Sequence, residues 1–164
     1  MMRLSKLTDY AVVMMVHMGQ ISETATADVL FTATRLSDET GVPQPTVAKV
    51  LKSLARAGLL RSVRGAQGGY VVERTPEQIS IAEIVQALDG PIALTACVDG
   101  ADDSCNVESL CGMRGNWNRV NEAIRSALGR VTLADMALTP MEFPVPDQPA
   151  RPAYGHSTST SRGA

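Results

Sequence analysis

The spacing of apolar residues predicts a first helix from Ser5 to about Gly19. Ser5 suits the N-cap, and Gly19 is placed to end the helix. Residues 20–33 show no clear period, so we expect a short connection there. The apolar positions that recur at three- and four-residue steps are Leu7, Ala11, Met14, Met15 and Met18.

Two further helices are predicted on either side of a tight turn. The first runs from about Ala33 to Thr40, and the second from about Pro45 to Ala57, because Gly41 and two prolines interrupt the pattern. In the second helix the apolar positions are Val47, Val50, Leu51 and Leu54, and the basic positions on the opposite side are Lys49, Lys52 and Arg56. This arrangement is typical of a helix-turn-helix.

A β-hairpin is predicted next. The β-prone runs 59–64 and 70–74 flank the glycine-rich sequence of residues 65–69. A hairpin directly after a recognition helix is the wing of a winged helix, with Arg64 at its tip, where it can reach a minor groove or phosphates. The glycine-rich turn lacks the following helix and the Lys-Ser/Thr of a nucleotide-binding loop, so a nucleotide site is excluded.

Two more helical stretches follow. Ser80 and Glu83 form a capping-box pattern that predicts a helix to Leu88. Residues 116–129 predict a long amphipathic helix with apolar positions Trp117, Val120, Ala123, Ile124, Ala127 and Leu128. It has little to pack on within its own chain, so we interpret it as a dimerisation helix. One more helical turn is predicted at residues 132–136, and a disordered tail from Pro140.

Charge and composition support a mainly α-helical, DNA-binding protein. Aromatic residues make up 4% of the chain, which favours aliphatic helix packing. Residues 41–75 contain six basic and one acidic residue in a chain whose net charge is −2, as expected of a nucleic-acid-binding element. An ordinary solvated helix face is the alternative. Without a signal peptide or a long apolar run, a cytoplasmic protein with no membrane partner is predicted.

All three cysteines, Cys97, Cys105 and Cys111, lie within fifteen positions. In a reducing compartment such a cluster favours metal or redox chemistry over disulfides. The spacing is wider than the pairs of structural zinc sites, so an iron–sulfur cluster with two or four irons fits better, with a zinc-stabilised protein as the alternative. An enzyme is disfavoured because the chain has two histidines and neither is near a cysteine in sequence.

The chain resembles the Rrf-two (Rrf2) superfamily of bacterial winged-helix regulators. The resemblance rests on residues 3–12 (Arg-Leu-Ser-Lys-Leu-Thr-Asp-Tyr-Ala-Val), on the wing sequence of residues 58–70, on residues 80–92 and on the three cysteines. Residues 114–117 (Arg-Gly-Asn-Trp) are similar to the regulators of SUF-type iron–sulfur cluster assembly. The resemblance implies a homodimeric repressor of cluster assembly genes that binds a pseudo-palindromic DNA operator, without a small-molecule substrate. A nitric-oxide or redox sensor is the alternative within this family.

The resemblance also implies a ligand set. IscR-like members carry a histidine three residues after the last cysteine, where this chain has Arg114, which cannot ligate. In NsrR-like members an aspartate from the partner protomer completes the cluster, and the matching residue here is Asp9. We therefore expect Cys97, Cys105, Cys111 and Asp9 as ligands. The alternatives to Asp9 are the loop carboxylates Asp99, Asp102, Asp103 and Glu108, or a thiol or water from outside the chain. His17 is interpreted as a packing residue.

For DNA contact we predict Gln44, Thr46, Lys49, Lys52 and Arg64. The lysines are expected to hold phosphates, and Arg64 to contribute specificity. Ala48 stands where IscR-like proteins have a discriminating glutamate, so binding to one motif is expected. The predicted division is a winged domain (1–90), a cluster loop (91–114), a dimerisation helix with a short turn (115–138) and the tail (139–164).

Overall fold

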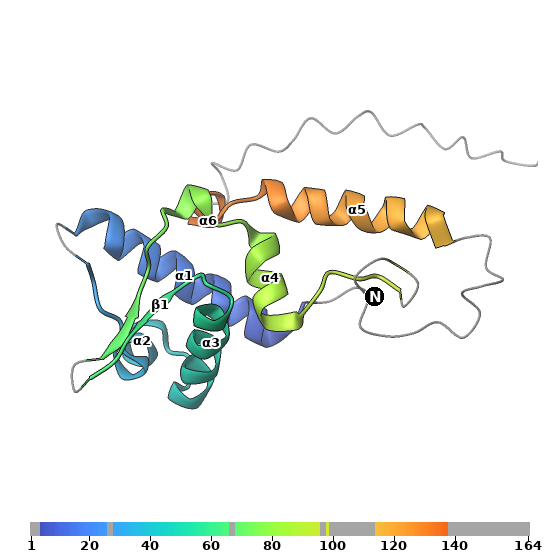
Figure 1. Ribbon diagram of the computed structural model, residues 1–164. Coiled ribbons are helices and arrows are strands. Elements are labelled where there is room, and N and C mark those ends of the chain that lie inside the picture. The colour runs from blue at the N-terminus through green and yellow to red at the C-terminus, as the bar shows by residue number, and fades with distance from the viewer. Residues whose placement is uncertain (1–3, 26–27, 66–67, 96–97, 99–113, 138–164) are drawn as a thin grey trace, which may run out of the picture.

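Helices and a two-stranded hairpin share one core, which is built mainly of aliphatic and methionine side chains. The computed structural model describes residues 4–25, 28–65, 68–95, 98 and 114–137. In these ranges the elements are α1 (Lys6–Thr24), α2 (Ala33–Thr40), α3 (Gln44–Arg56), β1 (Arg61–Val63), β2 (Gly69–Val71), the short 3-10 helix η1 (Pro76–Gln78), α4 (Ile81–Asp89), α5 (Arg114–Arg130) and α6 (Leu133–Ala137). Figure 1 shows α1 running behind α3 and α4, with the hairpin beside α2.

Helix α1 is longer than its sequence pattern predicts. Ser5 caps it as expected, because its hydroxyl accepts from the Thr8 N–H at 3.2 Å. The predicted end at Gly19 is wrong, because the helix continues to Thr24. Gly19 is buried, and a Cβ there would lie 3.0 Å from Pro76 Cγ. The glycine therefore allows η1 to approach the middle of the helix closely and does not end it.

The helix-turn-helix has the predicted bounds to within one residue. Gly41 ends α2 with φ 73°, a left-handed conformation that suits glycine. Helix α3 then begins at Gln44 with a proline in its first turn. All four of its predicted inward positions are fully buried, namely Val47, Val50, Leu51 and Leu54. The aliphatic face of α3 therefore anchors it to the core and leaves the basic face outside.

The wing is an antiparallel hairpin with an added partner. Ser62 lies opposite Tyr70 in the register of β1 and β2, and Phe31 forms an isolated bridge to Tyr70 from the other side. The Phe31 N–H donates to the Tyr70 carbonyl at 2.9 Å, and the Tyr70 N–H donates to the Phe31 carbonyl at 2.8 Å. At Gly69 a Cβ would lie 2.6 Å from the Phe31 oxygen, so this pairing requires glycine.

The last two helices fold back onto α4. The predicted capping box of Ser80 and Glu83 is present at the start of α4. Two backbone hydrogen bonds join the residues that follow α5 in the chain to the start of α4. The Ile81 N–H donates to the Val131 carbonyl (2.9 Å), and the Leu133 N–H donates to the Ile79 carbonyl (2.8 Å). These bonds fix the end of α5 against the start of α4.

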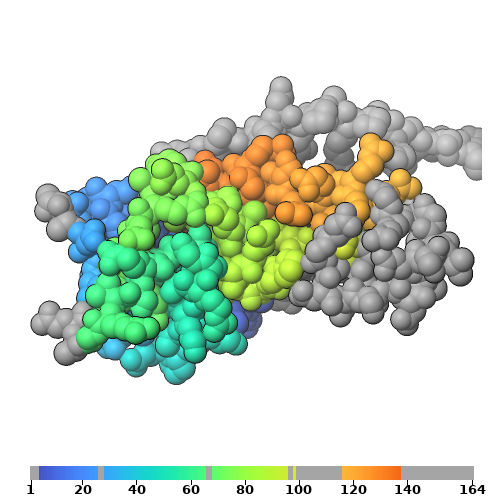
Figure 2. All heavy atoms as spheres, in the orientation of Figure 1, coloured from blue at the N-terminus to red at the C-terminus, as the bar shows by residue number. Residues whose placement is uncertain are grey.

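Helix α5 has more to pack on than its sequence suggests, and that part of the prediction is wrong. Ile124 and Leu128 are half-buried against α4 and the segment that follows it. Trp117 and Val120 remain 40% and 46% exposed, so the helix still presents an apolar outer surface. In the space-filling view α5 extends away from the end of the molecule that α3 and the wing form (Figure 2). None of the described helices is long and apolar enough to span a bilayer.

Candidate nucleic-acid interface and sensor segment

The outer face of α3 carries four of the five predicted DNA-contacting residues. Gln44, Lys49 and Lys52 are exposed, and Thr46 is half-buried in the first turn. Arg64, the fifth, follows β1 in the wing and is exposed. The structure therefore places all five on α3 or the wing, which lie next to each other at one end of the molecule (Figure 2).

Most of the arginines around this surface are already paired with carboxylates. Arg35 Nε donates to Glu39 Oε1 at 2.8 Å on α2. Arg61 bonds to Asp28 and Glu73, and Arg74 donates to Glu83. The hydrogen bond from Arg74 lowers the pKa of Glu83, and the bond to Glu73 raises the pKa of Arg61. These three cations are largely neutralised within the protein.

The cations of α3 and the wing tip have no such partners. Among the described residues, Lys49, Lys52, Arg56 and Arg64 form no ion pair and no side-chain hydrogen bond. Apart from Lys6 on α1, the described cations of the winged domain that lack an ion pair thus lie on the recognition helix and the wing, which is the electrostatic pattern of a DNA-binding surface. Arg56 was not among the predicted contacts, although it shares the basic side of the helix.

Gln44 has a structural role in addition to its exposed position. Its side-chain amide donates to the Thr34 hydroxyl at 2.9 Å, which ties the start of α3 to α2. The carbonyl oxygen of the same amide has no partner among the described residues, so it can still accept a hydrogen bond from a base.

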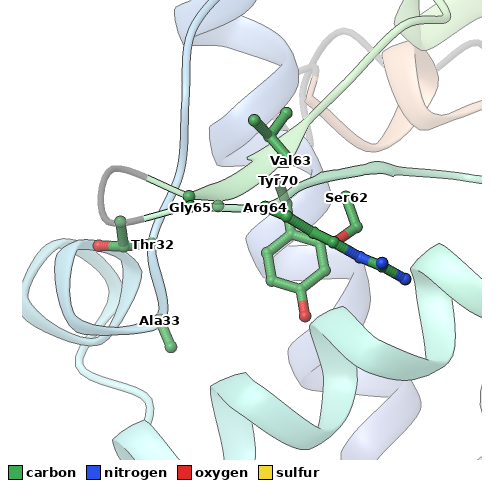
Figure 3. Close-up of a pocket in the computed structure, with 9 residues that line it drawn as sticks. Thr32, Ala33, Ser62, Val63, Arg64, Gly65 and Tyr70 are labelled. Atoms are coloured by element: carbon green, nitrogen blue, oxygen red, sulfur yellow. The ribbon is translucent and has the colours of Figure 1, made fainter.

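An open groove of about 420 Å³ separates the wing from the start of α2. Figure 3 shows Arg64, Ser62 and the Tyr70 ring on one side of the wing, with Val63 on the other. The opposite wall of the groove is formed by Thr32 and Ala33. Sequence reasoning selected Arg64 here and missed Tyr70 and Ser62, although the alternation of side chains along a strand places them on the same face.

His17 connects α1 to the helix-turn-helix. Its Nε2 lies 2.8 Å from Glu39 Oε2, and the same carboxylate accepts from Arg35. The Arg35 hydrogen bond and the His17 bond both lower the pKa of Glu39. His17 is thus held by a specific polar partner rather than by packing alone.

The three cysteines and the predicted loop carboxylates lie outside the described residues. Within the described ranges, no group of three His, Cys, Asp or Glu side chains is close enough to hold a metal ion. Arg114 is the first residue of α5. Asp9 is exposed in the first turn of α1, and its carboxylate has no partner among the described residues. A free carboxylate together with thiolates is a suitable donor set for iron, so the residues fit a cluster.

Two polar contacts fix the chain on its way to Cys97. Asp89, at the end of α4, accepts from the Thr8 hydroxyl (2.8 Å) and from the Ser5 N–H (3.1 Å). Asn121 on α5 is 3% exposed, and its amide bonds to the backbone of Ile92 and Leu94. The segment before Cys97 is therefore attached both to α5 and, through Asp89, to the turn of α1 that carries Asp9.

Comparison with known proteins gives a consistent result. A family model described as "Rrf2: Iron-dependent Transcriptional regulator" matches residues 4–139. The Mycobacterium tuberculosis protein Rv1287, named as an HTH-type transcriptional regulator, is 32% identical over 136 residues, which are 83% of this chain and 81% of that protein. The HTH-type transcriptional regulator NsrR of Bacillus licheniformis is 24% identical over 84% of this chain and 93% of its own length.

Solved structures agree with the predicted winged-helix fold. IscR of T. potens superposes with a TM-score of 0.56 at 26% identity, covering 82% of this chain and 85% of that one. CymR, the global cysteine regulator of B. subtilis, superposes with a TM-score of 0.59 at 24% identity, covering 84% of this chain and 97% of that one. The second likeness concerns the fold alone. Together they confirm the predicted architecture, mainly α-helical with a two-stranded wing.

Proposed function

The chain belongs to the Rrf2 family of transcriptional regulators, and on this premise we propose that it represses iron–sulfur cluster assembly genes according to cluster supply. Its DNA-binding part is the winged helix, and its sensor is the cysteine segment between α4 and α5. Relatives of the chain are named as transcriptional regulators, which supports a regulatory role.

The observation that supports DNA binding is that some cations of the winged domain are paired with carboxylates and others are not. Arg35, Arg61 and Arg74 are paired with carboxylates, whereas the cations of α3 and the wing tip have no carboxylate partner in the described part of the chain. Pairing with DNA phosphates would replace water and counterions around the free cations without breaking an ion pair of the protein. Lys49 and Lys52 would then hold phosphates, and Arg64 would reach into the minor groove.

The residues proposed to hold the cluster are Cys97, Cys105, Cys111 and Asp9 from the other copy of a homodimer. When bound, the cluster supplies iron that exchanges or reacts with oxidants, which is the chemistry a sensor requires. Asp9 suits the role because it is exposed and its carboxylate has no partner among the described residues, unlike Asp89, which accepts hydrogen bonds from Ser5 and Thr8. The description of the family as iron-dependent supports the same assignment.

The attachment of the segment before Cys97 suggests how the sensor could act on DNA affinity. Asn121 holds this segment to α5, which we propose as the dimer helix, and Asp89 holds the end of α4 to the first turn of α1. Ligands from both copies would fix the distance between the two recognition helices. The two half-sites of a pseudo-palindrome fit only one distance between the recognition helices. A coupling free energy of ~1–3 kcal/mol between cluster binding and DNA binding would change the affinity for DNA about 5- to 150-fold.

Anaerobic reconstitution followed by DNA binding tests this function. Duplexes selected from a random pool by the reconstituted protein would be used in gel-shift titrations with apo and reconstituted protein. We expect a brown, air-sensitive preparation and a difference in affinity between the two forms. Equal affinity in both forms would contradict sensing, and a colourless preparation that contains zinc would support a zinc-stabilised regulator instead.

A further inference from the structure

One face of the wing carries three polar side chains that have no partner among the residues the structure describes. Ser62 and Tyr70 are opposite each other in the strand register, and Arg64 follows Ser62 by two positions, so the three point to the same side. Within the described part of the chain, neither hydroxyl has a hydrogen-bond partner, and the Arg64 guanidinium has no ion pair. Figure 3 shows these side chains together beside the groove.

The other face of the hairpin is different. Arg61 precedes Ser62 and points to the opposite side, where it is bound to Asp28 and Glu73. The groove face has no carboxylate among its lining residues. Its far wall is the start of α2, and the first turn of that helix contains no acidic residue. As far as the described residues line it, the groove is therefore a polar, electropositive site without a carboxylate to balance Arg64.

We propose that the hydroxyls of Tyr70 and Ser62 bind one phosphate of the DNA backbone in this groove. The inference rests on the proposed DNA-binding function and adds two contacts to it. A phosphodiester oxygen accepts hydrogen bonds from hydroxyls, and such contacts fix the register of a protein on the duplex without reading sequence. Bound in this way, the backbone lies beside Arg64, which remains free to extend past it into the groove of the duplex.

The test is a hydroxyl deletion that preserves packing. Tyr70 is half-buried against the core, and Tyr70→Phe keeps its ring while removing the donor. With a short duplex selected by the wild-type, full-length protein, we expect Tyr70→Phe to weaken binding about 3- to 10-fold. The salt dependence of binding should not change, because no charge is lost. Tyr10→Phe, which removes a phenolic hydroxyl from α1, is the matched control and should bind like the wild type.

A double-mutant cycle between Tyr70 and single DNA phosphates distinguishes a direct hydrogen bond to one phosphate from an indirect effect of the substitution on the wing. Single phosphates of the duplex are replaced one at a time by neutral methylphosphonates, and binding is measured for the wild type and for Tyr70→Phe. We expect one position at which the replacement weakens the wild type but hardly affects the variant. Equal affinity of Tyr70→Phe and the wild type, or additive losses at every position, would overturn this inference. If Lys49→Ala still weakens binding in that case, the DNA-binding function stands.

Discussion

The side-chain amide of Asn121 donates to the carbonyl oxygen of Ile92 at 2.9 Å, and its oxygen accepts from the Leu94 N–H at 3.0 Å. One buried side chain thus satisfies two backbone groups of the segment that leads to the cysteines. A buried backbone group that loses its partner costs free energy, so this contact stabilises the position of the segment on α5.

Asn121→Ala should therefore destabilise the protein by about 1–3 kcal/mol, because two buried hydrogen bonds are lost together. Urea unfolding at fixed protein concentration measures the change. Glu122→Ala, at the next and exposed position of α5, is the control and should change stability by less than about 0.5 kcal/mol. If the two variants were equally stable, the Asn121 contacts would not hold the segment.

Asp89 predicts a pH dependence of stability. Burial raises the pKa of Asp89, but hydrogen bonds from Ser5 and Thr8 outweigh this effect and leave the pKa below its ordinary value of 3.8. A carboxyl with a lowered pKa stabilises the fold above the pKa of the unfolded chain, and this stability is lost as the pH falls through the folded pKa. Because Asp89 is exposed, screening limits the contribution to about 1 kcal/mol or less.

The Asp89 effect is measured by urea unfolding at neutral pH and at successively lower pH. Asp89→Asn should be less stable than the wild type at neutral pH, and the difference should shrink below about pH 4. A difference that stays constant down to the lowest pH would show that ionisation of Asp89 does not contribute.

Lys49→Ala and Lys52→Ala should each weaken binding to selected and unrelated duplexes by similar factors. Each should also reduce the slope of log affinity against log salt by about one, because one phosphate contact is lost. Arg125→Ala on the exposed side of α5 is the matched loss of charge and should leave the slope unchanged. A loss confined to the selected duplex would instead assign the lysine to base recognition.

Asp9→Ala should weaken cluster retention. After anaerobic reconstitution, we expect the visible absorbance of the variant to decay faster than that of the wild type when an iron chelator is added. Glu23→Ala, at the other end of α1, removes an exposed carboxylate from the same helix and serves as the control. An unchanged spectrum and decay rate for Asp9→Ala would remove Asp9 from the ligand set.

Gly69→Ala should destabilise the wing, because its Cβ would lie 2.6 Å from the Phe31 carbonyl oxygen. We expect a loss of about 1–3 kcal/mol from the broken bridge and shifted backbone. Gly129→Ala on α5 has nothing within 4 Å of its Cβ and should stabilise the helix by about 0.5–1 kcal/mol. Thermal unfolding of the two variants compares these effects, and a neutral Gly69→Ala would contradict the required close approach.

Local signals in the sequence were sufficient for much of the fold. Gly41 and the prolines that follow it define the turn of the helix-turn-helix, and Ser80 with Glu83 defines the start of α4, because caps and turns depend on neighbouring residues. Gly19 failed as a helix end because its role depends on Pro76, which is remote in sequence. The local sequence does not distinguish a glycine inside a helix from a glycine at its end, because the difference depends on the residue that packs against it.

The candidate site was also predictable only where it depends on residues that are close in sequence. The basic face of α3 and the position of Arg64 follow from periodicity, but ion pairing does not. The sequence therefore could not separate Arg61, which is paired, from Arg64, which has no ion pair among the described residues. Asn121 is a buried polar residue on the inner side of an amphipathic helix, and the periodicity of apolar residues does not identify such a position. Its partners are backbone groups of Ile92 and Leu94, which carry no sequence signal.

The bridge between Phe31 and Tyr70 has a consequence for the cost of binding DNA. Phe31 is fully buried, its backbone pairs with the wing, and Arg35 of α2 lies over its ring at 4.7 Å. The wing is therefore attached to the helix-turn-helix and is not an independent flap. Less conformational entropy is lost when a duplex binds a surface that is already ordered, so more of the contact energy is available as affinity.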